Sequence, residues 1–131
     1  MRTVAKHIPI KWLPDPEKQD YPGAYSYLTL LFEDEEVQWM VKKLKKAPVL
    51  PFKSKDIFRA SALALLPPEN FHVHRDRQKI ESGASLSPIL LVRLPGLARV
   101  LIADGYHRMC AVYSFDEDAV IPCKIVTGPV P

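Results

Sequence analysis

The chain has 131 residues, of which 47% are hydrophobic and 25% are charged, and its formal net charge is +3. This length and this balance predict one folded domain and exclude a globally disordered chain. The mild positive charge permits an anionic ligand without requiring nucleic acid.

Two cysteines are too few for a disulfide framework, so the reducing cytoplasm is the expected compartment. The first seven residues lack the apolar run of a signal peptide. The longest apolar runs are too short to span a bilayer, and we therefore expect no membrane partner. The sequence leaves the oligomeric state open.

The N-terminal part of the chain, residues 1–56, predicts an extension that contains one clear helix. Residues 1–24 are rich in proline and polar groups and predict an irregular arm, with a short strand near residues 8–10. Residues 25–32 are apolar and aromatic, a run that fits a strand or a buried helical turn. Residues 33–46 predict a helix, because acids open it, lysines close it and an apolar stripe repeats at three- and four-residue spacing.

The middle of the chain predicts short elements. Asp56 is a candidate cap for one helical turn, and residues 62–66 predict a strand. A second helix is expected over residues 70–82, with Asn70 as its N-cap and Gly83 at its end. His72 and His74 on this segment are interpreted as solvated side chains, because a metal site needs more convergent ligands.

The last 44 residues alternate strands and a helix. Residues 88–93 form a continuous apolar run, which is typical of a strand covered on both faces. Residues 98–103 follow a proline-glycine turn, so the two runs predict a hairpin. A helix over residues 106–115 and a strand over residues 119–126 complete the order, with Pro122 placing that strand at an edge or a bulge.

The most informative stretch is the junction of strand and helix at Asp104-Gly105-Tyr106-His107-Arg108. A helix that starts at a glycine turn presents unpaired N–H groups that attract anions. Arg108 can grip a phosphate through two parallel hydrogen bonds, and His107 can donate a hydrogen bond or move a proton. Asp104 is a candidate base or Mg²⁺ ligand. The candidate catalytic residues are therefore Asp104 and His107.

Plainer interpretations of the same residues stand beside this one. Asp104 is a favoured residue type for a helix N-cap. His107 could be an ordinary surface or half-buried histidine, and Arg108 could pair structurally with Asp104.

Three segments resemble ParB-like and sulfiredoxin-like domains in order and spacing. They are the proline-led apolar strand at residues 86–92, the glycine-histidine-arginine box at residues 103–111 and the closing isoleucine-proline strand at residues 120–126. The resemblance implies an α+β fold: a small mixed β-sheet with flanking helices over residues 57–126, carrying residues 1–56 as a helical extension. The aspartate before the glycine is similar to a variant found in a bacterial-type branch of this superfamily.

In such families this turn faces the phosphates of a bound nucleotide. The resemblance therefore implies Gly105, His107 and Arg108 as phosphate contacts. Tyr106 in the same turn, and Arg75 and Lys79 on the preceding helix, are further candidate ligand-binding residues. It also implies Mg²⁺ accompanying a nucleotide, with Asp104 as a metal ligand.

Two departures from the families narrow the function. Sulfiredoxins need a cysteine immediately before the histidine-arginine pair, where this chain has Tyr106, so sulfiredoxin activity is not expected. Partition proteins carry a helix-turn-helix domain after this module, for which the sequence has no room beyond residue 126. Cys110 and Cys123 are interpreted as small core residues.

The sequence thus predicts a nucleotide-binding or other phosphate-binding protein, with nucleotide hydrolysis or phosphotransfer as its candidate activity. One alternative is a metal-dependent nuclease, although the weak positive charge does not favour DNA as a partner. The other is a non-catalytic interaction or regulatory module in which Asp104 only caps the helix.

Overall fold

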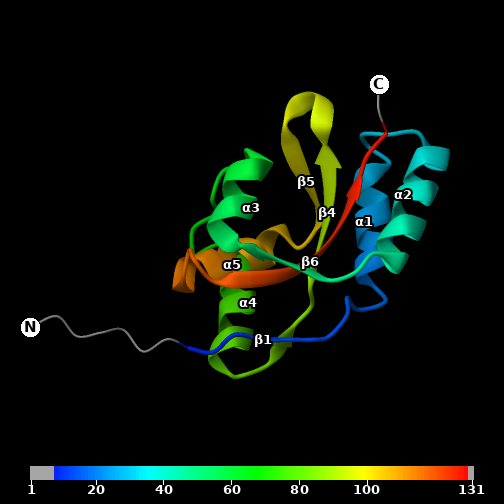
Figure 1. Ribbon diagram of the computed structural model, residues 1–131. Helices are drawn as coiled ribbons and strands as arrows, with labels where there is room; N and C mark the ends of the chain where they lie inside the picture. Colours follow the sequence, from blue (N-terminus) through cyan, green and yellow to red (C-terminus); the bar gives the residue numbers. More distant parts are fainter. Residues whose placement is uncertain (1–7, 130–131) are drawn as a thin grey trace, which may run out of the picture.

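The computed structural model describes residues 8–129, and the sequence-based expectations for residues 1–7 lie outside this range. The chain folds into an α+β structure around a four-stranded mixed sheet (Figure 1). Strand β6 runs parallel to β4 and antiparallel to β2, and β4 pairs with β5 as an antiparallel hairpin. In spatial order the strands are β2 (Leu50–Lys53), β6 (Val120–Thr127), β4 (Ile89–Leu94) and β5 (Arg99–Asp104).

A second, two-stranded sheet lies apart from the first. Strand β1 (Lys11–Trp12) pairs in parallel with β3 (Ser85–Leu86). The backbone of Leu13 adds one further hydrogen bond to Leu86, at 2.8 Å. The expected strand at residues 8–10 is therefore displaced by two to three residues, because pairing is available only where the chain meets β3.

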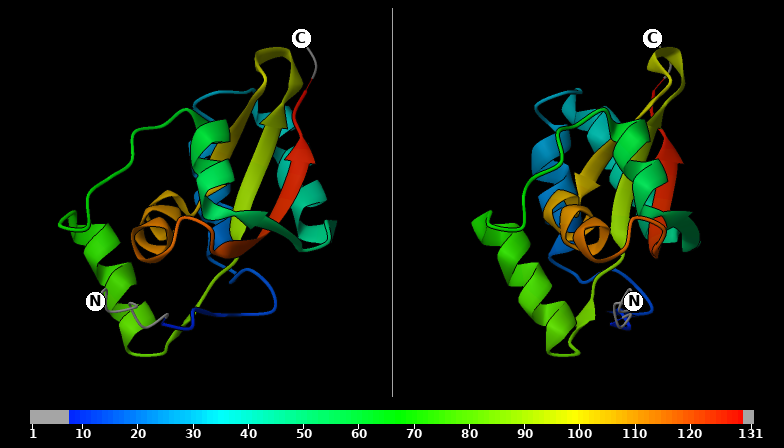
Figure 2. Two further views of the ribbon diagram at one scale, coloured as in Figure 1. Left: turned by 60° about the vertical axis from the view of Figure 1, so that its left-hand side comes forward. Right: turned by 90° about the vertical axis from the view of Figure 1, so that its left-hand side faces the viewer.

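Helices cover both faces of the main sheet (Figure 2). Helices α1 (Asp20–Leu28) and α2 (Asp34–Lys46) pack on one face. On the other face lie α3 (Ser54–Ser61) and α5 (Tyr106–Phe115), and α4 (Phe71–Glu81) packs against the outer side of α5. The sheet is thus the middle layer of the molecule.

The central strand β4 divides the core into two parts. Ile89 and Leu91 belong to the cluster under α3, α4 and α5, whereas Leu90 and Val92 belong to the cluster under α1 and α2. All four side chains are at most 2% exposed. Successive side chains of a strand point to opposite faces, so the four residues divide between the two clusters. The structure therefore confirms the strand covered on both faces that the continuous apolar run predicted.

Most of the predicted elements are confirmed, and several expectations were wrong. Residues 20–24 belong to α1 and not to an irregular arm, and Asp56 lies inside α3, whose N-cap is Lys53. Residues 62–66 form no strand: Ala62 adopts a left-handed conformation that ends α3, and the mostly exposed segment after it pairs with no strand of residues 8–129. Pro122 does not lie in an edge strand, because β6 is paired on both sides. Its register explains how it is tolerated, since it lies opposite Pro51 of β2 and the pairing with β4 begins only at Cys123.

The N-terminal part of the chain is built into the same sheet as the rest. The apolar stretch at residues 25–32, which fitted a strand or a buried helical turn, is helical as far as Leu28, where α1 ends, and turns after it. Strand β2 forms one edge of the sheet. The buried side chain of Lys124 donates to the backbone oxygen of Lys45 at 2.9 Å, which ties β6 to the end of α2. Within residues 8–129, the structure contains no helix whose length and apolar character would suit a membrane span.

Helix α4 offers a direct test of its predicted start. The Asn70 side chain accepts hydrogen bonds from the backbone N–H groups of His72 and Val73, at 3.0 and 3.2 Å. We expect Asn70→Ala to lower the free energy of unfolding by about 1 kcal/mol, because two N–H groups lose their acceptor. Urea denaturation measures the loss, and the exposed neighbour Glu69 supplies the control substitution Glu69→Ala, which should change little.

Candidate functional site

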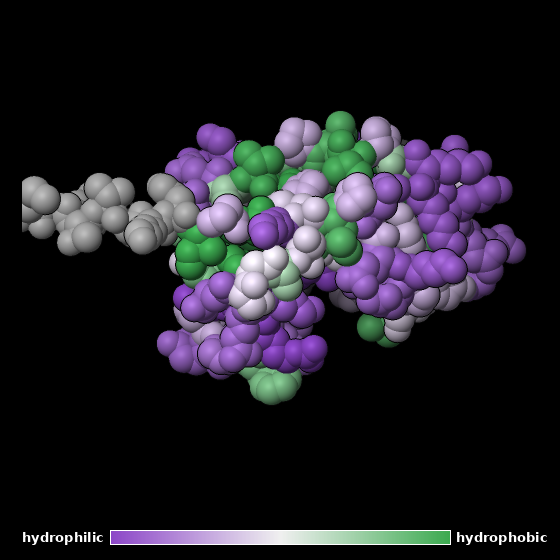
Figure 3. Space-filling model, turned by 90° about the horizontal axis from the view of Figure 1, so that it is seen from below, coloured by the Kyte–Doolittle hydropathy of each residue, from purple (hydrophilic) through white to green (hydrophobic). Residues whose placement is uncertain are grey.

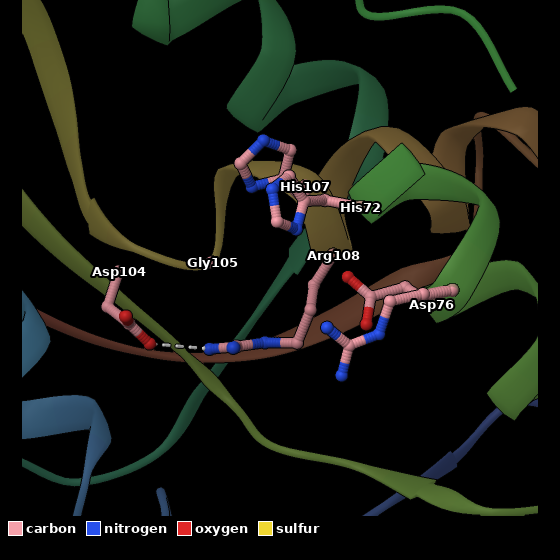
Figure 4. A pocket seen from close by; sticks show the side chains of 7 residues that line it. His72, Asp76, Asp104, Gly105, His107 and Arg108 are labelled. Atoms are coloured by element: carbon pink, nitrogen blue, oxygen red, sulfur yellow. Dashed lines mark hydrogen bonds and ion pairs between the residues drawn. The ribbon is translucent and has the colours of Figure 1, made fainter. Parts of the chain in front are cut away.

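A polar pocket of about 200 Å³ lies where β5 ends and α5 begins (Figure 4). Residues from three elements form its wall: Asp104 ends β5, the first turn of α5 follows it, and α4 faces both. The lining residues are His72, Arg75, Asp76, Asp104, Gly105, His107 and Arg108. The pocket therefore coincides with the predicted junction and adds one face of α4 to it.

Gly105 makes the sharp turn at this junction possible. Its φ of 111° lies in the region that side-chain-bearing residues rarely adopt. A Cβ atom there would lie 2.7 Å from Cγ1 of Ile89 and 3.0 Å from Nη2 of Arg108. The register also shifts next to the turn, since Leu90 lies opposite Asp104 while Leu91 lies opposite Ile102, a bulge that re-aims the end of β5.

The start of α5 has no side-chain cap. Gly105 occupies the N-cap position, and no side chain among residues 8–129 bonds to the first-turn N–H groups. The interpretation of Asp104 as the N-cap of this helix is therefore wrong, because its carboxylate turns toward Arg108 instead. The uncapped N–H groups and the helix dipole make this end of α5 favourable for an anion.

Asp104 and Arg108 form an ion pair across the turn. Nη2 of Arg108 donates to Oδ2 of Asp104 at 2.9 Å and to the backbone oxygen of Pro88 at 3.2 Å. The two side chains are only 16% and 22% exposed. Among residues 8–129, Nε of Arg108 is a buried side-chain polar atom that lacks a hydrogen-bond partner, so the donors of this guanidinium are not all satisfied within the protein.

The N-terminal helix α1 closes the far side of this ion pair. Gly23 lies so near Asp104 that a Cβ atom there would be 2.9 Å from its Oδ1. Asp20 is buried on the same helix and accepts hydrogen bonds from the Ser87 hydroxyl and from the backbone of Glu17. Burial raises the pKa of Asp104, the Arg108 guanidinium opposes this rise, and the neighbouring Asp20 adds to it.

Two histidines face each other at the mouth of the pocket (Figure 4). The ring centroids of His72 and His107 are 4.7 Å apart. Burial lowers the pKa of His107 and the nearby His72 lowers it further, whereas Asp76 acts in the opposite direction. Near neutral pH, His107 is therefore held in the uncharged form, which can donate one hydrogen bond and accept another.

Asp76 is the second carboxylate of the pocket. Its side chain is 14% exposed, and its Oδ1 lies 4.0 Å from Nζ of Lys79. Burial raises the pKa of Asp76, and four surrounding basic groups oppose that rise, with Lys79 and Arg108 acting most strongly. The pocket thus holds two carboxylates, two guanidiniums and two histidines.

The structure brings together most of the residues predicted for the site. Asp104, Gly105, His107, Arg108 and Arg75 all line the pocket. Two predicted residues are not among its lining residues: Tyr106, whose hydroxyl donates to the backbone oxygen of Ala64, and Lys79, which approaches Asp76.

The sequence analysis missed two lining residues, His72 and Asp76. They are four positions apart, so they lie on one face of the predicted helix, and Arg75 lies close to the same face. The histidine-arginine-aspartate spacing carried this information. The spacing alone does not place His72 in the site, because the residue that it contacts, His107, lies 35 positions further along the chain. The sequence pairs His72 more obviously with His74, two positions away.

The side chains of the pocket are poorly suited to bind Mg²⁺ directly. Residues 8–129 contain no group of three or more His, Cys, Asp or Glu side chains arranged to hold a metal ion. The Asp104 carboxylate is bonded to a guanidinium, whose charge repels a cation. The lining residues therefore do not fit a metal held mainly by protein ligands.

Both cysteines are buried and unpaired, as predicted for small core residues. Burial raises the pKa of the Cys110 thiol, and it raises the pKa of Cys123 to about 12. Neither forms a reactive thiolate readily, because the thiolate form is disfavoured at such sites.

A scan against protein-family models, a search of curated proteins and a search of solved structures each found no match for the chain.

The turn at Gly105 predicts a strong effect of a single methyl group. We expect Gly105→Ala to destabilise the fold by about 1–3 kcal/mol, since the new Cβ meets Ile89 in a backbone conformation that alanine disfavours. Chemical denaturation measures the loss. Gly96→Ala is the matched control, because no atom lies within 4 Å of the position of its Cβ. Equal stability of the two variants would contradict this account of the turn.

The histidine pair predicts a measurable titration. We expect His72→Asn to raise the pKa of His107 part of the way toward its ordinary value, because burial, the larger cause of the shift, remains. NMR titration of the His107 ring protons measures this change, with His74→Asn as the control on the same helix.

The lowered pKa of His107 also makes stability depend on pH. Because the folded pKa of His107 is below its unfolded one, the unfolded chain binds the proton more readily, so acidification from the unfolded pKa down through the folded pKa lowers the free energy of unfolding.

Proposed function

We propose that this pocket binds the phosphate group of a small molecule, and that the ligand is a nucleotide. The observation that supports the proposal best is the convergence of Arg75, Arg108 and the uncapped start of α5 on one polar pocket. Guanidinium groups and first-turn N–H groups are the donors that proteins use for phosphate. The ParB/sulfiredoxin-like resemblance of the surrounding segments supplies the nucleotide as the ligand class.

The two arginines differ in what they offer the ligand. Arg108 is mostly buried and fixed by Asp104 and Pro88, so it forms a rigid wall of the site. Arg75 is an exposed residue of α4 that needs no other bond to be broken before it closes over a phosphate. A fixed donor orients the ligand without further ordering, and an exposed donor adds positive charge at the cost of ordering its side chain.

A hydrolytic or phosphotransfer activity, which we propose as the consequence of binding, would depend mainly on charge stabilisation. Uncharged His107 is the group suited to donate a hydrogen bond to a transferred phosphate or to accept a proton. Asp104 acts through Arg108, which it holds in place. Where Mg²⁺ takes part, nucleotide phosphates and water would hold it, as is usual for this ion.

Calorimetric titration with ATP, CTP and GTP, each with and without Mg²⁺, tests this function. The variant of choice is Arg75→Ala, because removing Arg108 would leave the Asp104 carboxylate buried and unpaired. We expect the wild type to bind at least one nucleotide and Arg75→Ala to bind it about ten times more weakly, the loss of one charge-assisted hydrogen bond.

Arg99→Ala is the matched control. Arg99 is an exposed arginine at the opposite end of β5, so its removal changes the net charge equally without touching the pocket. Equal weakening by both substitutions would indicate a non-specific effect of charge. If the folded wild type bound none of the three nucleotides, the non-catalytic module would become the leading interpretation.

A further inference from the structure

Phe71 is an exposed aromatic residue beside the pocket. Its side chain is 68% exposed at the first turn of α4, although the fold has a large core in which to bury it. The Arg75 guanidinium carbon lies 5.9 Å from the centre of its ring, and the His72 ring stands edge-on to it at 5.4 Å. Both neighbours also line the pocket.

The aromatic rings continue from Phe71 into the site. His72 contacts Phe71 on one side and His107 on the other, with ring centroids 4.7 Å apart in the second pair. His107 lies directly after Tyr106, whose ring is 5.5 Å away. A row of flat side chains therefore leads from the phosphate-facing turn to the surface, and Figure 4 shows its two histidines together above Arg108.

The pocket itself is too small and too polar for a whole nucleotide. Its volume of about 200 Å³ suits phosphate groups, and its wall consists of charged and polar side chains with one glycine. Hydrophilic side chains cover much of the surface seen from below, with smaller apolar areas between them (Figure 3). A ligand that carries an aromatic ring must therefore place that ring outside the pocket, on an apolar surface adjoining it.

We propose that Phe71 is the platform on which the base of a bound nucleoside phosphate stacks, while the phosphates lie in the pocket. This inference rests on the proposed function and names the second recognition element of the ligand. Every nucleobase has a flat face that an exposed aromatic ring can cover, so the platform selects nucleoside phosphates over inorganic phosphates without choosing among bases. Arg75 connects the two parts, since it lies beside the Phe71 ring and lines the pocket.

Titration of wild type and Phe71→Ala with ATP and with inorganic tripolyphosphate tests the platform. Loss of one stacked base weakens binding by about 1–3 kcal/mol, which corresponds to roughly 5- to 150-fold in affinity. We therefore expect Phe71→Ala to weaken ATP by this factor and to bind tripolyphosphate as the wild type does. Phe71→Trp should restore ATP affinity, and its fluorescence should be quenched by ATP but not by tripolyphosphate.

Leu97→Ala is the matched control, because Leu97 is also 68% exposed but lies in the β4–β5 turn. It should leave both titrations unchanged. The inference is overturned if wild type binds ATP no more tightly than tripolyphosphate, or if Phe71→Ala weakens both ligands equally. If neither ligand binds the folded wild type, the proposed function fails, and the platform fails with it.

Discussion

The ion pair between Asp104 and Arg108 joins the last residue of β5 to the first turn of α5 across a glycine turn. Several other features of the site depend on it. It holds the guanidinium against the backbone of Pro88, and it keeps the Asp104 carboxylate from capping α5, so the first N–H groups of that helix stay available. The turn can close so tightly only because Gly105 has no side chain.

This pair also links the N-terminal helix to the site. The carboxylate of Asp104 lies against Gly23, and Asp20 of the same helix raises the pKa of Asp104. Burying a carboxylate is unfavourable unless its charge is matched, and Arg108 supplies the match. The residues that precede β2 are therefore part of the environment of the site as well as a cover for the sheet.

The sequence predicted the elements whose pattern is local. The helix at residues 34–46 has both its apolar stripe and its charge order, the Asn70 cap marks the start of α4, and the apolar run of β4 shows that both faces are buried. The strand order could not be read in the same way. Pro122 predicted an edge or a bulge, but β6 is an inner strand that pairs with β2 and β4. The proline is tolerated because it lies opposite Pro51, 71 positions earlier in the chain, and because the pairing with β4 begins only at Cys123.

Only the part of the site that is contiguous in the sequence was predicted from the residues themselves. The turn at Asp104-Gly105 and the residues after it are contiguous, so their chemistry was legible in one short motif. The contribution of α4 depends on which face of that helix meets α5, and tertiary packing decides this. Arg75 was therefore identified only through the family resemblance, and His72 and Asp76 were missed as lining residues.

The central claim is that the uncapped start of α5 and the facing side of α4 bind phosphate. NMR titration of the ¹⁵N-labelled protein with pyrophosphate tests it most directly. The account predicts that the largest amide shifts occur at Gly105, Tyr106, His107 and Arg108, with smaller shifts in the first turns of α4. Saturable shifts centred elsewhere, for example at the β4–β5 turn, or no shifts at millimolar pyrophosphate, would contradict it.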